Sequence, residues 1–288
     1  MQDVSRVKIA QNNTRVCQFS DILLETYHFI PNLSVPPHVH DEYQIGLTLD
    51  APGEYYYRGA THSIPIGSLS VLHPGEVHSG RSLGTSEVEI VTRKLYIPPD
   101  RMQQVMAEMI EHKPVSLPFI PTPILVDQSL ISAFLNLHQT LAGAASQLEQ
   151  ESLLLSTLIQ LVQGYAESAP EIRAYKTACQ AVERVREYLH DHYAENVSLN
   201  RLAEIAELSA FHLCRIFTHE VGLPPHRYQT QVRIAQAKRL LICGVPLQQL
   251  ALEVGFSHQS HFGRHFKQIV GVTPGRYVSS NNVIDSQG

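Results

Sequence analysis

The first hundred residues alternate between short β-prone runs and turn-forming residues. The β-prone runs are Glu25–Ile30, Tyr43–Asp50, Gly53–Arg58, Ser68–Leu72 and Glu87–Ile97. Turn-forming pairs such as Pro36-Pro37, Pro52-Gly53 and Pro74-Gly75 separate them. Several short strands with regular turn signals are typical of a β-sandwich or a β-barrel. We therefore expect an N-terminal β domain.

After Asp100 the hydrophobic period changes from that of strands to that of helices. Apolar residues in Met102–Ile110 follow the i, i+3, i+4 spacing of one helix. Two further amphipathic stretches, Gln128–Ala142 and Gln147–Tyr165, carry apolar stripes that need a partner. Periodicity leaves open whether these stripes cover the β domain or form a dimer interface.

The C-terminal part contains one helical pattern twice. Leu199–Ala203 matches Leu247–Ala251 at an offset of 48 residues, and Phe217–Tyr228 matches Phe266–Tyr277 at an offset of 49. Matches in this order indicate an internal duplication in which the second copy has one extra residue.

Each copy predicts two helices joined by a short turn. In the second copy Pro246 begins a helix that ends at Gly255, and proline and glycine favour these two positions. This is the pattern of a helix-turn-helix unit, whose second helix enters the major groove of DNA. The units span about residues 199–220 and 247–270. Two packed helical hairpins without DNA binding would have a similar pattern, but basic residues at matching places in both copies favour DNA binding.

Polar and basic residues on the outward side of each second helix are the candidate DNA contacts. Arginine can bond guanine with two hydrogen bonds, and glutamine can pair with adenine. The candidates are Phe211, His212 and Arg215 in the first unit, and His258, Gln259, His261, Arg264 and Lys267 in the second. We expect Lys267 to contact phosphate, which adds affinity for DNA of any sequence.

The second unit carries a family signature. Its residues 251–267 (ALEVGFSHQSHFGRHFK) and 271–277 (GVTPGRY) resemble the motif of the AraC/XylS family of bacterial transcription regulators. The resemblance covers Ser198–Tyr277. It implies two helix-turn-helix units, joined by a long helix at about His226–Leu241, that read adjacent major-groove segments. The first unit departs from the pattern, because Glu207 stands where Gly255 stands in the second.

Histidines gather in the β domain. His38 and His40 are two residues apart, so in a strand they point the same way, and His78 can approach from a neighbouring strand. The arrangement resembles a cupin barrel, as expected for the sensor domain of AraC-type regulators. In metal-binding cupins a glutamate follows the two histidines, but Gln44 occupies that position here, and a neutral amide suits a transition metal poorly. We therefore expect a small-molecule pocket and no bound metal.

The candidate ligand-binding residues can donate and accept hydrogen bonds. They are His38, His40, Gln44, Tyr55, Tyr57 and His78. Tyr55 and Tyr57 face opposite to Tyr56 and Arg58, and the pattern leaves open which of the two pairs lines the pocket.

The two halves of the chain differ in net charge. Residues up to Arg173 hold 10 Lys+Arg and 18 Asp+Glu, whereas the remainder holds 12 and 9, so the basic part is the C-terminal one. The four cysteines are far apart, which argues against a disulfide framework and fits a reducing cytoplasm. No stretch approaches the roughly 20 apolar residues that span a bilayer, and we find no secretory signal.

We therefore expect an α+β multidomain chain with a cupin-like β-barrel (residues 1–100), a helical dimerisation segment and linker (101–170) and an all-α DNA-binding domain (174–280). The expected function is that of a ligand-responsive, sequence-specific transcription regulator, an activator rather than an enzyme, that has no cofactor. Its expected partners are double-stranded DNA, a small-molecule effector, RNA polymerase and a second copy in a homodimer, with no membrane. Two alternatives remain: a metal-dependent cupin enzyme with an accessory helical domain, and an architectural DNA binder with a vestigial sensor.

Overall fold

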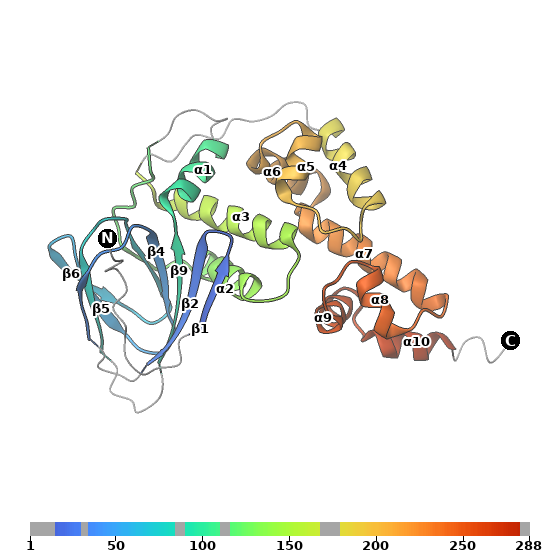
Figure 1. Ribbon diagram of the computed structural model, residues 1–288, viewed down its shortest axis with the longest axis horizontal. Helices are drawn as coiled ribbons and strands as arrows, with labels where there is room; N and C mark the ends of the chain where they lie inside the picture. The colour runs from blue at the N-terminus through green and yellow to red at the C-terminus, as the bar shows by residue number, and fades with distance from the viewer. Residues whose placement is uncertain (1–14, 30–33, 84–89, 110–115, 168–178, 283–288) are drawn as a thin grey trace, which may run out of the picture. The chain divides into compact units, whose positions relative to one another are not determined.

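The computed structural model describes residues 15–29, 34–83, 90–109, 116–167 and 179–282 (Figure 1). The chain forms two compact units. The first, here called the sensor unit, comprises Met1–Ala142 and Ser156–Ile172, and the second, here called the helical unit, comprises Gly143–Leu155 and Arg173–Gly288. The expected boundary between residues 170 and 174 lies outside the described residues and stays a prediction.

Two antiparallel sheets form the sensor unit. One has the strand order β1-β2-β9-β4-β7-β10 and the other the order β3-β8-β5-β6. The strands are β1 (Arg15–Phe19), β2 (Ile22–Phe29), β3 (Ser34–His38), β4 (Tyr43–Thr48), β5 (Gly53–Tyr57), β6 (Ala60–Ile64), β7 (Ser68–Leu72), β8 (His78–Ser82), β9 (Ile90–Ile97) and β10 (Ile124–Leu125). The expected β-barrel class is confirmed. The ends of two expected strands, at Ile30 and at Glu87–Glu89, lie outside the described residues.

Strand β4 explains how the sequence builds a site inside the sheets. It pairs with β7 on one edge and with β9 on the other, so it lies in the middle of its sheet. Alternation places Ile45 and Leu47 on one face and Gln44 on the other, and all three side chains are buried. A polar residue on the second buried face therefore points into the protein and needs a partner there.

The expectation of a turn at Pro36-Pro37 is wrong, because both prolines lie inside β3. Proline has no N–H group for a sheet, so within sheets it is confined to edges and irregular positions. Strand β3 is an edge strand, and its register with β8 shifts between Val35 and His38. The prolines are therefore compatible with the strand that ends at His38.

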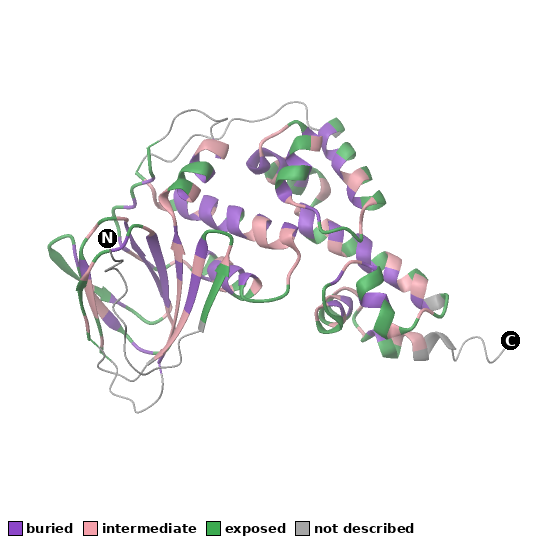
Figure 2. Ribbon diagram, viewed as in Figure 1, coloured by how far each residue is buried: buried purple, intermediate pink, exposed green. Residues whose placement is uncertain are grey.

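Three helices accompany the strands: α1 (Pro99–Met109), α2 (Gln128–Leu141) and α3 (Gln147–Tyr165). The expected helix residue Ile110 and part of the Pro-rich break that follows it lie outside the described residues. Asp127 caps α2 and accepts hydrogen bonds from the backbone N–H groups of Ser129 and Leu130. The apolar stripe of α2, from Leu130 to Leu141, is buried (Figure 2). This stripe is thus covered within one chain.

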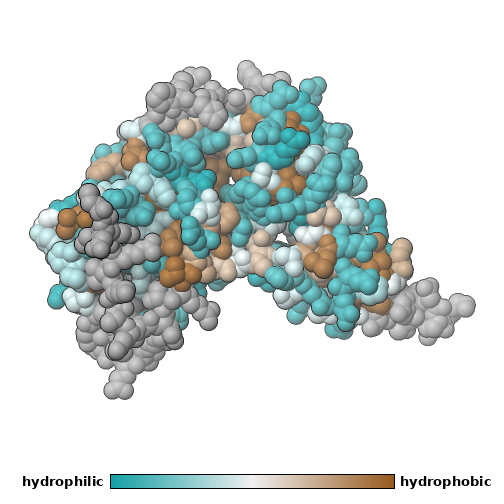
Figure 3. Space-filling model, viewed as in Figure 1, coloured by the Kyte–Doolittle hydropathy of each residue, from teal (hydrophilic) through white to brown (hydrophobic). Residues whose placement is uncertain are grey.

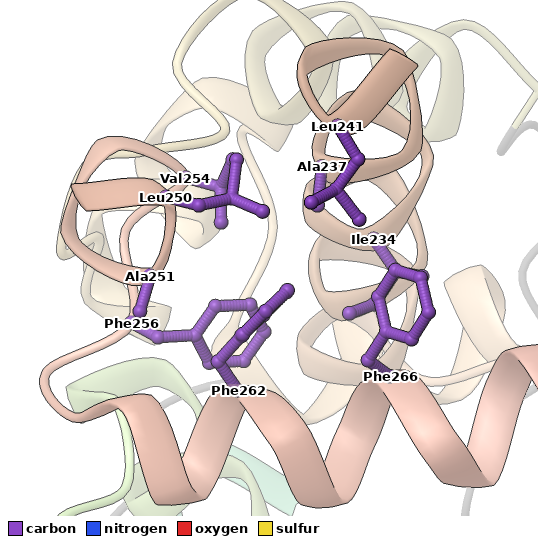
Figure 4. Packing of buried hydrophobic residues seen from close by; sticks show 9 residues of the cluster. All are labelled: Ile234, Ala237, Leu241, Leu250, Ala251, Val254, Phe256, Phe262 and Phe266. Atoms are coloured by element: carbon purple, nitrogen blue, oxygen red, sulfur yellow. The ribbon is translucent and has the colours of Figure 1, made fainter. Parts of the chain in front are cut away.

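Among the described residues, the helical unit contains the beginning of α3, up to Leu155, and seven further helices. The seven are α4 (Cys179–Asp191), α5 (Leu199–Ala206), α6 (Ala210–Val221), α7 (Pro225–Ile242), α8 (Leu247–Glu253), α9 (Gln259–Val270) and α10 (Pro274–Asn282). In the second half of this unit, Phe262 and Phe266 of α9 pack against α7 and α8 (Figure 4). The same two positions carry the family signature, so the signature is in part a packing requirement.

None of the described helices is both long and apolar enough to cross a bilayer. The visible face of each unit is mostly hydrophilic, with small apolar patches (Figure 3).

Candidate DNA interface and ligand pocket

The first helix-turn-helix unit is formed by α5 and α6, and local capping sets both helices. Ser198 accepts a hydrogen bond from the backbone N–H of Arg201 at 3.1 Å. Ser209 caps α6 and accepts one from the N–H of His212 at 3.3 Å. Between the helices Glu207 adopts a left-handed conformation with φ 55°, which reverses the chain. The expected turn is confirmed.

The second unit makes its turn with Gly255 between α8 and α9. Gly255 has φ +87°, and an added Cβ would lie 2.4 Å from the carbonyl oxygen of Ala194. A left-handed conformation and a close backbone approach therefore both require glycine here. Glu207 can occupy the matching place in the first unit, because its side chain is 81% exposed.

Two arginines occupy matching exposed positions on the second helices. Arg215 on α6 and Arg264 on α9 are both exposed. Each lies two residues before a phenylalanine, Phe217 or Phe266, that is 0% exposed. Because the phenylalanine anchors one face of the helix, the arginine lies on the other face. The duplication thus places two guanidinium groups at equivalent surface points.

Other polar residues share these faces. His258, Gln259 and Lys267 are exposed, as a DNA contact requires. Sequence reasoning passed over further exposed residues on the same helices, namely Thr218 and His219 on α6 and Ser260 and Gln268 on α9. Counting three and four residues from each arginine along the helix would have found them.

Three of the expected DNA contacts face inward, and those expectations are wrong. Phe211 is 4% exposed and His212 is 3% exposed. A ring nitrogen of His212 lies 2.9 Å from the Ser209 hydroxyl, so this imidazole serves the helix cap. His261 is partly buried, with its Nε2 2.9 Å from Nε2 of His265. None of the three presents a free edge to a base.

In the sensor unit, the three expected histidines come together where β3 and β8 meet. His38 and His78 are register partners, and their ring centroids are 4.2 Å apart. The His40 ring is 4.8 Å from the His78 ring and 6.2 Å from that of His38. The geometry therefore unites all three imidazoles in one cluster.

Each of these histidines uses its Nδ1 in the same way. Nδ1 lies within 3.1 Å of a backbone carbonyl two residues away, that of Pro36 for His38, Glu42 for His40 and Glu76 for His78. An Nδ1–H that donates to a carbonyl leaves Nε2 with its lone pair. The Nε2 atoms of His40 and His78, and Nε2 of Gln44, are buried without a hydrogen-bond partner among the described residues. Such buried polar atoms fit a site that a ligand completes.

A cavity of about 810 Å³, its open mouth included, lies beside this cluster. Its lining includes His38, Gln44, Tyr55 and His78 of the expected set, and Tyr27 and Lys94. The Lys94 ammonium donates to Oε1 of Gln44 at 3.3 Å. Lys94 lies on the same side of β9 as Thr92, which also lines the cavity, but only the structure shows that β9 pairs with β4.

The two candidate tyrosines, Tyr55 and Tyr57, lie in different surroundings. Tyr55 lies over Gly80, its register partner, and lines the cavity. Tyr57 is 0% exposed, and its hydroxyl lies 3.0 Å from Nδ1 of His73 and accepts from the His73 N–H. The expectation that Tyr57 binds ligand is therefore wrong, because its polar group is already used in the core. Tyr56, 57% exposed, faces away.

Burial sets the charge of the histidine cluster. Loss of hydration lowers the pKa of His78 to about 4 and also lowers the pKa of His40. Both rings are neutral at pH 7. The pocket suits an organic ligand with polar groups.

Comparison with known proteins assigns the family. The model of the AraC-like ligand binding domain matches residues 24–158, and that of a helix-turn-helix domain matches residues 202–280. The chain is 32% identical over 258 residues to the uncharacterized HTH-type transcriptional regulator YbfI of Bacillus subtilis, covering 87% of this chain and 90% of that protein. This chain belongs to the AraC family of transcriptional regulators. The alternative of a cupin enzyme is not favoured.

Two further relatives of this AraC-family chain are notable. The HTH-type transcriptional activator RhaS of Escherichia coli is 25% identical over 253 residues, with 85% of this chain and 88% of that protein covered. The C-terminal domain of AraT from Geobacillus stearothermophilus is a solved structure with 28% identity and a TM-score of 0.35, covering 36% of this chain and 88% of that chain. The two family-model matches give this chain an AraC-like ligand-binding domain and a helix-turn-helix domain.

Proposed function

We propose that this AraC-family regulator activates transcription when a small polar molecule enters the barrel cavity, and that Arg215 and Arg264 read bases in successive major-groove segments. The observation that carries the proposal is the matching exposure of these two arginines in the duplicated units. The connecting helix α7 has 18 residues and is about 27 Å long, which is of the same order as the roughly 34 Å between successive major-groove segments.

Replacement of either arginine by alanine should cost about 1–3 kcal/mol of binding free energy for the cognate site and relax preference at one or two base pairs. The positions affected in Arg215→Ala and Arg264→Ala should differ by roughly 10 base pairs. Binding-site selection with the full chain measures both effects. Arg186→Ala on α4 is the matched control, because its guanidinium bonds Glu183 at 2.8 Å. Unchanged base preferences in both arginine variants would refute direct readout.

The sensing half of the proposal predicts a thermal shift. Ligand bound to the folded chain raises Tm by mass action, so a panel of small metabolites screened at fixed concentration should contain compounds that raise it. In His78→Ala, the affinity for such a compound should fall about two- to tenfold, since a hydrogen bond to Nε2 is lost. His190→Ala, an exposed imidazole on α4, should respond like wild type. Equal shifts in all three proteins would place the ligand elsewhere.

The remaining partners are part of the same proposal. Activation implies contact with RNA polymerase. The name of the relative RhaS, a transcriptional activator, supports activation rather than repression. A DNA-binding regulator without catalysis would work in the cytoplasm. A homodimer stays a proposal. The apolar stripe of α2 is not proposed as its interface, because that stripe is buried within a single chain.

A further inference from the structure

A second cluster of side chains that can ligate a metal lies in the helical unit, on α9 and the beginning of α3. His261 and His265 are four residues apart on α9, so they point the same way. Glu149, near the start of α3, lies against them, with its Oε2 3.8 Å from Nε2 of His261. One ligand atom from each of the three lies within 4.8 Å of the others.

Several contacts hold Glu149 in this place. The Gly143–Leu155 segment belongs to the helical unit. The Ser257 hydroxyl donates to the carbonyl of Ala144 at 2.7 Å, just before α9. Within the first turns of α3, the N–H of Gln147 donates to Oδ1 of Asn196 at 3.0 Å, and Glu151 accepts from the N–H of Leu199 at 2.6 Å. The carboxylate of Glu149 is therefore positioned by its surroundings.

Packing holds the two imidazoles side by side on α9. Their ring centroids are 4.5 Å apart. The Phe256 ring packs at 5.6 Å from His261 and 5.9 Å from His265 and limits how the rings turn.

We propose that Glu149, His261 and His265 form a binding site for a divalent transition-metal ion, with Zn²⁺ the best match. Two histidines at i, i+4 and a carboxylate from another helix are an established zinc donor set. Around a tetrahedral Zn²⁺ at about 2.0–2.2 Å from each donor, ligand atoms lie roughly 3.4 Å apart. The separations here, 2.9 Å between the Nε2 atoms and 3.8 Å to the carboxylate, bracket that value. Water would fill the fourth position.

The site does not depend on the proposed DNA contacts or on the barrel pocket. Arg264, a proposed base reader, lies one residue before His265 on α9. Metal binding would therefore fasten the helix that carries Arg264 to the beginning of α3 within the helical unit.

Titration of the full chain with Co²⁺ tests the site, because Co²⁺ can replace Zn²⁺ and its visible absorption reports the coordination. One equivalent should bind, and Zn²⁺ should displace it. His265→Ala and the isosteric Glu149→Gln should each weaken Co²⁺ binding by at least about tenfold. His190→Ala, which removes an exposed histidine on α4, should bind like wild type.

The double variant His40→Ala/His78→Ala separates this site from the barrel. It should keep the Co²⁺ signal if the ion binds at α9. Circular dichroism of each metal-free variant shows whether it is folded, and Glu149→Gln stands in for His265→Ala if that variant is not. The proposal is overturned if wild type binds no Co²⁺, if Glu149→Gln binds it as tightly as wild type does, or if the barrel variant loses it.

Discussion

Gly255→Ala should lower the free energy of unfolding of the helical unit by about 2–5 kcal/mol. Two costs combine: a left-handed conformation in a residue with a Cβ costs roughly 1–2 kcal/mol, and overpacking typically adds 1–3 kcal/mol. The Cβ would meet the oxygen, carbonyl carbon and Cα of Ala194 at 2.4–2.8 Å, and these are backbone atoms that cannot rotate away.

Gly271→Ala separates the two costs. Gly271 has φ +88°, almost the same as Gly255, but nothing lies within 4 Å of its added Cβ. It should lose only the conformational part, about 1–2 kcal/mol. Urea unfolding of the full chain, followed by circular dichroism, measures both losses. Equal losses in the two variants would show that the contact with Ala194 does not matter.

Acidification should destabilise this protein strongly between pH 6.5 and about 4. His73, His78 and His226 are 6%, 2% and 7% exposed. Burial lowers the pKa of each from 6.5 to about 4, and Arg58 and Arg227 reinforce the effect at His73 and His226. Below pH 6.5 the unfolded chain binds protons that the folded chain does not. The contribution of these neutral histidines to the free energy of unfolding is therefore fully present above pH 6.5. It decreases as the pH falls toward 4, by up to about 1.4 kcal/mol per pH unit for each histidine.

Unfolding free energies measured from pH 7.5 to 4.5 check this expectation. His226→Gln should reduce the slope of the pH profile by about one proton, because one buried imidazole is removed. The exposed His190→Gln should leave the profile as in wild type. A stability that does not change over this range, or that rises as the pH falls, would contradict the assigned burial.

The helix-turn-helix units could be predicted because their signals are local. Ser198, Ser209 and Pro246 begin helices through the groups nearest to them in sequence, and Gly255 ends one. The repeat adds a second copy of the same signals. Glu207 departs from the family pattern, and the structure accommodates it, because Glu207 adopts the left-handed conformation that glycine has in the second unit.

The barrel could be predicted in part. The alternation in β4 and the pair His38 and His40 are visible in the sequence, and the cluster with His78 followed from them. The second sheet was less visible, because β6 and β8 are short and polar. Lys94 was missed because the sequence does not indicate that β9 lies beside β4.

By itself, the sequence determined the family, the order of the two domains and the duplicated helices, since these depend on motifs and periods along the chain. The tertiary structure alone decided which side of each element is covered. A helix or strand period defines two faces, but only packing buries one of them, so Phe211 and His212 turned inward while Arg215 stayed exposed. Packing also brought Glu149 to His261, residues far apart in the chain. No local signal encodes such a meeting, because it depends on how separate helices pack together.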